Sequence, residues 1–324
     1  MSTGHKVAQG RAEFVFLLIA STFLMGSSFA VGKILLQAGF EPMILVGWRF
    51  LLAAFATLPF VFLENGHVMS ALLPARAGWR DAALVITIGL LQTAGVMSLL
   101  FLAMRSISAS TAAILLFTNP IWVAVLGKLF LGETLHRTRL AGLLVGVTGV
   151  TLAIGLAPDA LSGNDVSRGE LTGLAAAFCW AGATIINKRA KLPFGSWALS
   201  FWQMLIGAVA VLIIAYASGQ HWPERTTPSQ WTWFLWLSIP ASTGSFGLWF
   251  LALAKGGATK ASGYLFLAPL FAVMTSFFIL GTTLSWMQAA GGLLIGLALW
   301  LMNREGSGAS RRERLEEALA EGEP

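Results

Sequence analysis

Ten apolar segments, each about as long as a bilayer is thick, run through almost the whole of this 324-residue chain. A helix needs about 17–25 residues to cross the hydrocarbon core of a membrane. Backbone amides in lipid must be paired within their own segment, so helices are expected rather than strands. The chain is therefore predicted to be an all-α integral membrane protein with ten transmembrane helices. The segments lie near residues 14–36, 43–63, 82–104, 108–131, 137–157, 171–187, 194–217, 231–254, 261–283 and 286–303.

The distribution of charge predicts how these helices are oriented. Only 11% of the residues are charged, against about a quarter in soluble domains. With the N-terminus inside, 15 of the 21 lysines and arginines fall in inner segments and three in outer loops. The positive-inside rule then predicts a multi-pass protein of a bacterial-type cytoplasmic (inner) membrane, with both termini cytoplasmic. Because the excess charge of +6 follows one side of the membrane, it is not interpreted as a nucleic-acid signal. A cleaved signal peptide is the alternative for the first segment.

The chain also contains an internal repeat. Residues 101–135 and 250–284 lie 149 positions apart and share 12 identities in 35 aligned positions. Similar matches near an offset of 155 pair the first segment with the sixth and the second with the seventh. Five helices per half is an odd number, so the second half must enter from the opposite face, which predicts two inverted repeats. The expected parts are a cytoplasmic N-terminus (1–13), a first repeat (14–157), an external linker (158–170), a second repeat (171–303) and a cytoplasmic tail (304–324).

Several short motifs accompany the ten segments. They are Gly-Ser-Ser-Phe-Ala-Val-Gly-Lys at 26–33, Arg49-Phe50, and Pro120 followed by Leu131-Gly132-Glu133. In these features the chain resembles the EamA family of the drug/metabolite transporter superfamily. The resemblance implies a central cavity lined by helices one to four and six to nine. It also implies export of amino acids or other small metabolites, with import by some members. Gln203 stands where the repeat would place a second arginine, so any role of Arg49 is expected to be asymmetric.

Arg49 is the principal candidate for binding a substrate. It lies about seven residues into the second segment, which at 1.5 Å per residue is roughly 10 Å below the outer surface. An ionised side chain at such a depth costs about 2.5–3.5 kcal/mol, so a reason for keeping it is expected. One interpretation is a cavity cation that binds a substrate carboxylate or phosphate. The other is a structural clamp on carbonyls of broken helices, and the sequence leaves both open. Lys33 and Lys188 lie near segment ends and are expected to snorkel.

Other polar and aromatic residues at similar depth complete the predicted cavity. Ser242, Ser245 and Trp249 fall on one face of the eighth segment. As alternatives, hydroxyls can simply hold helices together, and tryptophans can belong to interfacial belts. The full set of predicted cavity residues is Arg49, Trp48, Gln92, Thr93, Asn119, Trp122, Trp180, Thr184, Trp202, Gln203, Ser242, Ser245 and Trp249.

Two prolines and four glycines are predicted to shape the bundle. Pro120 and Pro269 occupy the same position in the two copies, near the middle of the fourth and ninth segments. Because proline removes a backbone hydrogen bond, we expect a pair of kinks that act as a gate at the substrate site, with packing kinks as the alternative. Small residues four apart allow close helix packing. A seam between the halves or between subunits is therefore expected at Gly142, Gly146, Gly292 and Gly296.

No catalytic, metal or cofactor site is predicted. All four histidines lie in loops or termini, and the single cysteine, Cys179, has no partner for a disulfide. Residues 26–33 lack the spacing of a phosphate-binding loop, and Ser245 has no histidine within a segment to activate it. None of the 15 acidic residues falls deep in a predicted segment, which argues against tight coupling to ions.

The sequence thus predicts a transporter rather than an enzyme. It would export amino acids or related small compounds by alternating access around a midplane cavity. A small-molecule substrate and the lipid bilayer are the expected partners, without nucleic acid, and the protein would be a monomer or homodimer. An importer or exchanger of metabolites or drugs with the same fold is the alternative. A membrane sensor or scaffold would need a larger soluble part, and an intramembrane enzyme would need an acid–base or metal set within the segments.

Overall fold

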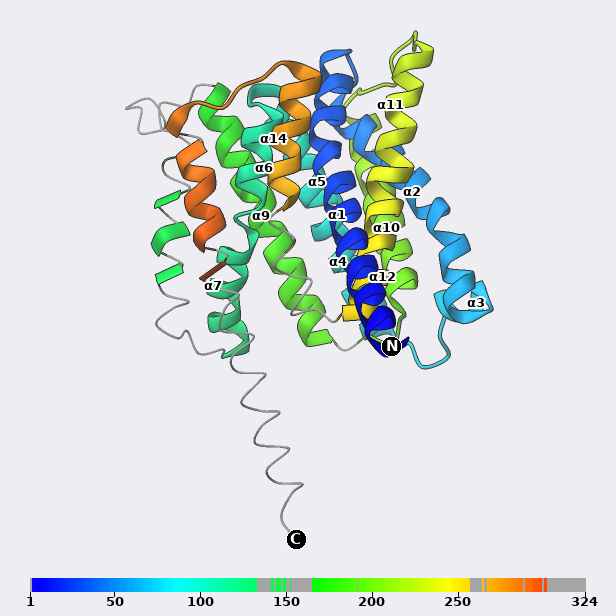
Figure 1. The fold of residues 1–324 in the computed structure, drawn as a ribbon. Helices are drawn as coiled ribbons and strands as arrows, with labels where there is room; N and C mark the ends of the chain where they lie inside the picture. The colour runs from blue at the N-terminus through cyan, green and yellow to red at the C-terminus, as the bar shows by residue number, and fades with distance from the viewer. Residues whose placement is uncertain are drawn as a thin grey trace.

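A computed structural model describes residues 2–132, 165–190, 192–256, 267–287 and 289–298, together with parts of 141–152, residue 264 and residues 300–301. Throughout these residues the regular structure is helical, and the helices stand side by side in one bundle (Figure 1). The start of α1 lies at the lower end of the bundle in Figure 1. We call this end the N-terminal face and the other end the distal face.

Residues 2–132 form six α-helices that pack together, one short helix and one π-helical turn. They are α1 (Ser2–Gln37), α2 (Pro42–Asn65), α3 (Val68–Leu72), α4 (Trp79–Gly89), η1 (Leu90–Gly95), α5 (Val96–Ser106), α6 (Ala109–Leu116) and α7 (Asn119–Leu131). The second half repeats the pattern. Its elements are α9 (Asp165–Ala190), α10 (Ser196–Ala217), α11 (Pro228–Ser238), η3 (Ile239–Gly244), α12 (Ser245–Gly256) and α14 (Leu267–Leu280), followed by a helix at 289–298.

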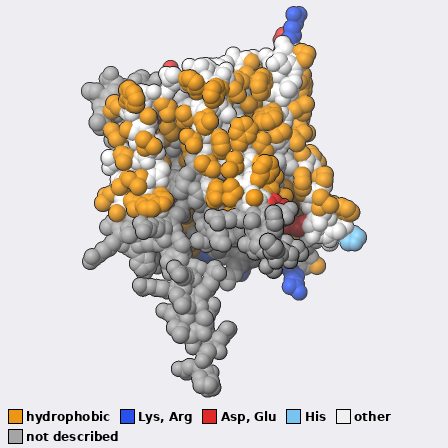
Figure 2. Space-filling view, viewed as in Figure 1, with side chains coloured by type: hydrophobic (Ala, Val, Ile, Leu, Met, Phe, Trp, Pro, Cys, Tyr) orange, Lys and Arg blue, Asp and Glu red, His pale blue; other side chains and the backbone are white. Residues whose placement is uncertain are grey.

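Six helices in the described part of the chain are long and apolar enough to cross a membrane. Two shorter apolar helices, α14 and the helix at 289–298, accompany them. Hydrophobic side chains cover the sides of the bundle that are visible in Figure 2, and charged ones stand near its two ends. These features identify an all-α, multi-pass membrane protein. The predicted fifth segment (137–157) lies mostly outside the described residues, so the count of ten remains a prediction. The six long apolar helices span residues 12–37, 42–65, 79–106, 109–131, 167–187 and 196–217.

The first helices of the two halves run in opposite directions. Near the end of α1, Lys33 Nζ donates a hydrogen bond of 3.0 Å to Ile107 O. Near the start of α9, a Cβ built on Gly169 would lie 3.1 Å from the Ile107 side chain. The end of one helix and the start of the other therefore meet the same residue at the distal face. Because α1 starts at the N-terminal face and α9 starts at the distal face, the two are antiparallel (Figure 1).

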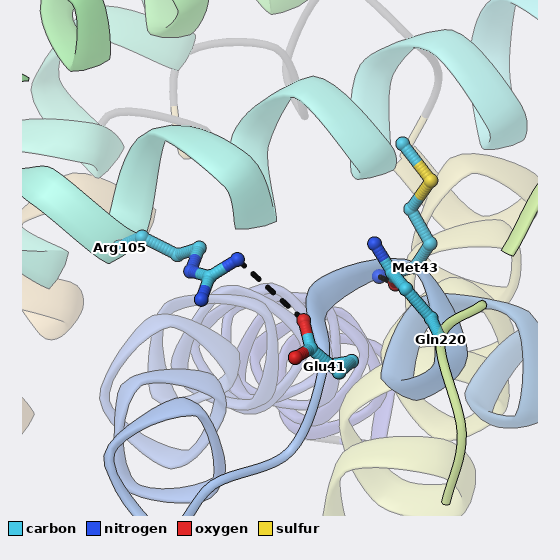
Figure 3. Close-up of polar contacts among 4 residues, drawn as sticks. All are labelled: Glu41, Met43, Arg105 and Gln220. Atoms are coloured by element: carbon cyan, nitrogen blue, oxygen red, sulfur yellow. Dashed lines mark hydrogen bonds and ion pairs between the residues drawn. The ribbon is translucent and has the colours of Figure 1, made fainter. Parts of the chain in front are cut away.

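The second helices, α2 and α10, are also antiparallel and pack along their lengths. At the distal face, Met43 N at the start of α2 donates to Gln220 Oε1, just after α10 (3.3 Å; Figure 3). At the N-terminal face, Glu64 near the end of α2 lies beside Gly195, which precedes α10.

An edge-to-face aromatic pair recurs at matching positions of the repeat. Phe23 on α1 contacts Phe271 on α14, with ring centroids 5.5 Å apart and planes at 85°. Phe178 on α9 contacts Trp122 on α7, at 5.6 Å and 84°. Phe23 and Phe178 are 155 positions apart, and Trp122 and Phe271 are 149 apart, the two offsets found in the sequence. In the described helices, the first helix of each half therefore packs on the fourth helix of the other half.

An ion pair between exposed side chains lies at the distal face. Arg105 Nη1, at the end of α5, lies 3.5 Å from Glu41 Oε2, which directly precedes α2 (Figure 3). The Arg105 and Glu41 side chains are 57% and 39% exposed. An ion pair with this exposure contributes at most about 1 kcal/mol. The helix packing beneath this ion pair, rather than the pair itself, holds the bundle together.

Candidate functional site

Arg49 lies on the second turn of α2, inside the bundle. Pro42 occupies the first turn of α2, where its missing N–H costs no hydrogen bond. The apolar residues that follow Pro42 pack into the bundle, and the Arg49 side chain is only 3% exposed. Its Nε donates a hydrogen bond of 2.9 Å to Ser242 Oγ on η3. The guanidinium carbon lies 4.7 Å from the ring centre of Phe50 and 5.6 Å from that of Phe101.

The guanidinium group of Arg49 is only partly satisfied. In the described part of the chain, the bond to Ser242 is its one hydrogen bond, and no carboxylate lies within 4 Å of it. Its two terminal nitrogens therefore have no acceptor among these residues. A buried charge without a counterion is costly, and proteins keep one where a partner is supplied. The arrangement can accept a carboxylate or phosphate, which binds arginine through two parallel hydrogen bonds.

The hydroxyl groups around η3 all donate hydrogen bonds to backbone carbonyls. Ser242 Oγ, besides accepting from Arg49, donates to Leu237 O at 2.9 Å. Thr243 Oγ1 donates to Ala53 O of α2, also at 2.9 Å. Ser245 Oγ, at the start of α12, lies 2.9 Å from the carbonyl oxygens of Ala241 and Ser242 in η3, to which it donates. Of the two predicted cavity serines, Ser242 thus contacts Arg49, whereas the Ser245 hydroxyl is bonded to nearby backbone carbonyls.

A second group of predicted residues meets between η1 and α10. Gln92 and Thr93 lie in η1, and Thr93 is buried. A Cβ built on Gly207 of α10 would fall 2.4 Å from Thr93 Cβ, so the two elements touch closely. Gln203 lies one turn earlier on α10, and its carbonyl oxygen would be 3.2 Å from a Cβ on Gly89. This group is the first-half counterpart of the contact between Arg49 and η3.

A third group lies between α7 and α9. Asn119 Nδ2 donates to Ala177 O at 3.4 Å, and Trp122 Nε1 donates to Thr118 Oγ1 at 3.3 Å. Trp180 packs edge-to-face on Phe117, with ring centroids 5.9 Å apart. Thr184 Oγ1 donates to Trp180 O of its own helix. In this conformation the Asn119 amide nitrogen, the Trp122 indole and the Thr184 hydroxyl each donate to the protein itself.

Three predicted tryptophans lie apart from Arg49. Trp48 is 38% exposed, donates to Tyr216 Oη at 3.1 Å and lines a groove of about 580 Å³. Trp202 Nε1 donates to Leu72 O at 2.9 Å, in the region of α3. Trp249 packs near Leu17 in the N-terminal half of α1. Side chains adjacent in a helix point about 100° apart, which is why Trp48 and its neighbour Arg49 face different surroundings.

Pro120 stands at the start of a helix rather than inside a continuous one. α6 ends at Leu116 and α7 begins at Asn119, with Pro120 in its first turn. Pro269 lies in α14, and the residues directly before Leu267 lie outside the described part of the chain; it lines a groove of about 660 Å³. The expected kink at Pro120 is therefore a break between two helices.

Of the four predicted packing glycines, the structure gives a close contact for one. A Cβ on Gly146 would lie 2.4 Å from Ile121 and 3.3 Å from Ala298. Gly292 and Gly296 line the same groove as Pro269, and Gly296 has open space around it. Gly142 is buried.

Two charged residues have surroundings that sequence reasoning missed. Lys33 was expected to snorkel, yet its ammonium donates to the carbonyls of Met104 and Ile107 at the end of α5. Glu170 is 5% exposed and lies in α9, which begins at Asp165 although the predicted sixth segment begins at residue 171. Because Glu170 is near the distal end of α9, it does not lie deep in a segment, and the expectation of weak coupling to ions stays a prediction.

Within the described residues, no group of three His, Cys, Asp or Glu side chains could hold a metal ion. Lys188, Lys191 and the segment 257–263 lie outside what the structure describes at the side-chain level.

A family model described as the EamA-like transporter family matches residues 13–155 and 167–304 of this chain. An uncharacterised transporter from Archaeoglobus fulgidus is 28% identical over 289 residues, 88% of this chain and 96% of its own length. A probable amino-acid metabolite efflux pump from Salmonella typhimurium is 27% identical over 297 residues, 88% of this chain and 93% of its own. One solved crystal structure covers 88% of this chain with a TM-score of 0.62 at 20% identity, a likeness of fold alone.

Proposed function

This chain belongs to the EamA-like transporter family, and from that premise we propose that it exports amino acids or related small metabolites by alternating access. Membrane transport of metabolites follows from the family, whereas substrate and direction are our proposal. The similarity to a probable amino-acid metabolite efflux pump over 88% of the chain supports export of an amino acid or a related compound.

The observation that carries the proposal is the half-satisfied guanidinium of Arg49. It is buried, has one hydrogen bond to Ser242, and has no acceptor for its terminal nitrogens among the described residues. An amino acid or similar metabolite presents a carboxylate whose two oxygens match those nitrogens. We therefore propose that Arg49 binds the carboxylate of the substrate, in preference to the alternative of a clamp on backbone carbonyls.

Alternating access is supported by the arrangement of the two halves. Their equivalent helices are antiparallel and exchange equivalent contacts, as in transporters that rock one repeat against the other. At 3% exposure Arg49 is shielded from both faces, so the halves must part to admit a substrate. We propose ten helices in two inverted repeats, 14–157 and 171–303, with Pro120 and Pro269 at the points where helices four and nine bend.

The test is transport by the purified protein in proteoliposomes, with radiolabelled amino acids beginning with phenylalanine and leucine. We expect Arg49→Ala to abolish transport while the protein still inserts into the membrane, because the cation proposed to bind the carboxylate is lost. Arg80→Ala is the matched control, since Arg80 is exposed beside Trp79. Unchanged kinetics in Arg49→Ala would remove this residue from the mechanism.

Direction requires a second arrangement of the same assay. Loading the vesicles with labelled amino acid and following its exit, with and without amino acid outside, separates export, import and exchange. Exit that depends on substrate outside would indicate an exchanger, and uptake alone from the face equivalent to the cell exterior would indicate an importer.

A further inference from the structure

Helices three and eight both contain a π-helical turn, and the two turns occupy equivalent positions. η1 covers Leu90–Gly95 and η3 covers Ile239–Gly244. Each residue of η3 lies 149 positions after its counterpart, the offset of the sequence repeat. The i→i+5 bond that closes each turn also matches, because it runs from Val96 N to Leu91 O and from Ser245 N to Pro240 O. π-turns are rare and occur often at functional sites.

Each turn packs against the opposite half of the molecule at equivalent residues. A Cβ on Gly95 of η1 would lie 3.4 Å from Cys179 Sγ of α9. A Cβ on Gly244 of η3 would lie 3.6 Å from Leu24 Cδ1 of α1. Cys179 and Leu24 are 155 positions apart, the offset between the first helices of the two halves. Each π-helical turn therefore contacts the first helix of the opposite half at an equivalent residue. We call these two contacts joints.

The turns also meet the second helices. Thr93 of η1 lies against Gly207 of α10, and Thr243 of η3, one residue after the counterpart of Thr93, donates to Ala53 O of α2. Ala53 and Gly207 are 154 positions apart, the same offset as Arg49 and Gln203. The polar side chains on the second helices, Arg49 and Gln203, are not equivalent in charge. η3 faces a cation, Arg49, whereas η1 faces the region of the neutral Gln203.

The geometry of η3 fixes the Ser242 hydroxyl. Its hydrogen is donated to Leu237 O, five residues earlier, at 2.9 Å. A lone pair of the same oxygen is thereby directed to Arg49 Nε, also at 2.9 Å. Ser242 is 1% exposed, and the donor of its hydroxyl is occupied. It holds one edge of the guanidinium, and the edge with the terminal nitrogens has no acceptor among the described residues.

We propose that Ser242 is a positioning residue, which holds Arg49 at a π-helical joint so that its terminal nitrogens meet an anionic group of the substrate. The role rests on the proposed function of Arg49. Ser242 acts through Arg49 and not by contact with the substrate. η3 belongs to the second half and holds Arg49, which lies on α2 of the first half. It thus links the proposed anion site to the opposite half, which must move when the bundle opens.

The experiment compares Ser242→Ala, Ser242→Thr and Ser238→Ala in proteoliposomes with labelled phenylalanine and leucine. Ser238 is the matched control, since it is fully buried one turn earlier and its hydroxyl donates only to Phe234 O. We expect Ser242→Ala to raise KM about tenfold with little change in maximal rate, the scale of a hydrogen bond to a charged group. Ser242→Thr keeps the hydroxyl and should restore KM, and Ser238→Ala should stay within about twofold of the parent.

A second measurement needs no substrate and separates this proposal from the proposed function. In protein labelled with ¹⁵N-arginine, the Nε–H signal of Arg49, identified by its loss in Arg49→Lys, should exchange slowly with water. Ser242→Ala should make its exchange fast, whereas Ser238→Ala should not. Slow exchange in Ser242→Ala, or an unchanged KM in that variant, would overturn the proposal. If Ser242→Ala makes exchange of the Arg49 Nε–H fast, but the parent protein transports neither phenylalanine nor leucine, the proposed substrate is refuted and the positioning role is supported.

Discussion

At the scale of single residues, Arg49 and Lys33 show why two cations in one bundle have different roles. The Lys33 ammonium has two carbonyl acceptors at the end of α5. Arg49 has one hydrogen bond through Nε, and its terminal nitrogens have no acceptor among the described residues. A cation whose donors are used stabilises the fold, and one with unused donors can bind a ligand. This difference, rather than depth in the membrane, is the basis on which we propose a substrate role for Arg49.

The role of Lys33 leads to a prediction about stability. Lys33→Met keeps the length of the side chain but removes the donor that caps α5. Hydrogen bonds from charged groups contribute about 1.5–3 kcal/mol each, so we expect a clearly lower midpoint of thermal unfolding in detergent. Lys128→Met is the control, because Lys128 is exposed. Equal midpoints for the two variants would contradict the capping role.

Sequence reasoning found Arg49 because a charge within an apolar run is visible along the chain. It could not find the capping role of Lys33, since the acceptors lie 71 and 74 residues away. It also grouped Trp202 with the cavity, and it could not show that this indole donates to Leu72 O. Depth can be counted in a sequence, but the face that a side chain presents depends on which helix packs beside it.

At the scale of helices, the ends were easier to predict than the interruptions. The predicted segments 43–63 and 194–217 lie close to α2 (Pro42–Asn65) and α10 (Ser196–Ala217), because polar residues bound these apolar runs. The π-turns were missed. A π-turn is stabilised by packing across the halves and has no local propensity of its own. Its one sequence signal is the recurrence of a hydroxyl and a glycine, Thr93 and Gly95 against Ser242 and Gly244.

Close packing of α1 on α14 gives a prediction for a single glycine. A Cβ on Gly26 would lie 2.6 Å from Ala268 O and 2.7 Å from Phe271 Cβ, and neither atom can swing away. We expect Gly26→Ala to destabilise the protein by about 1–3 kcal/mol, the usual cost of overpacking. Gly296→Ala is the same change where nothing lies within 4 Å, and should be neutral. Thermal unfolding in detergent measures both. A neutral Gly26→Ala would show that α1 and α14 do not pack this closely.

At the scale of the whole molecule, the halves are alike in packing and unlike in charge. Helices one and four exchange the same aromatic contact in both directions, and both halves carry a π-turn at the same place. The repeat in the sequence predicted this relation because it preserves packing residues. Arg49 has no basic counterpart, since Gln203 stands at the matching position. The proposed anion site would therefore lie off the axis, in the half that contains α2.

The inverted arrangement and its orientation can be tested by labelling from each side of the membrane. Ala75 lies between α3 and α4 at the N-terminal face, and Glu224 lies between α10 and α11 at the distal face; both are exposed. Arg76 and Arg80 follow Ala75, so the positive-inside rule predicts that this end is cytoplasmic. In a Cys179→Ser background, Glu224→Cys should react with an impermeant maleimide in intact cells, and Ala75→Cys only after permeabilisation. The parent without cysteine is the control for background labelling. Reaction of both positions in intact cells would place two ends of the bundle on one side, which antiparallel helices that cross the membrane do not allow.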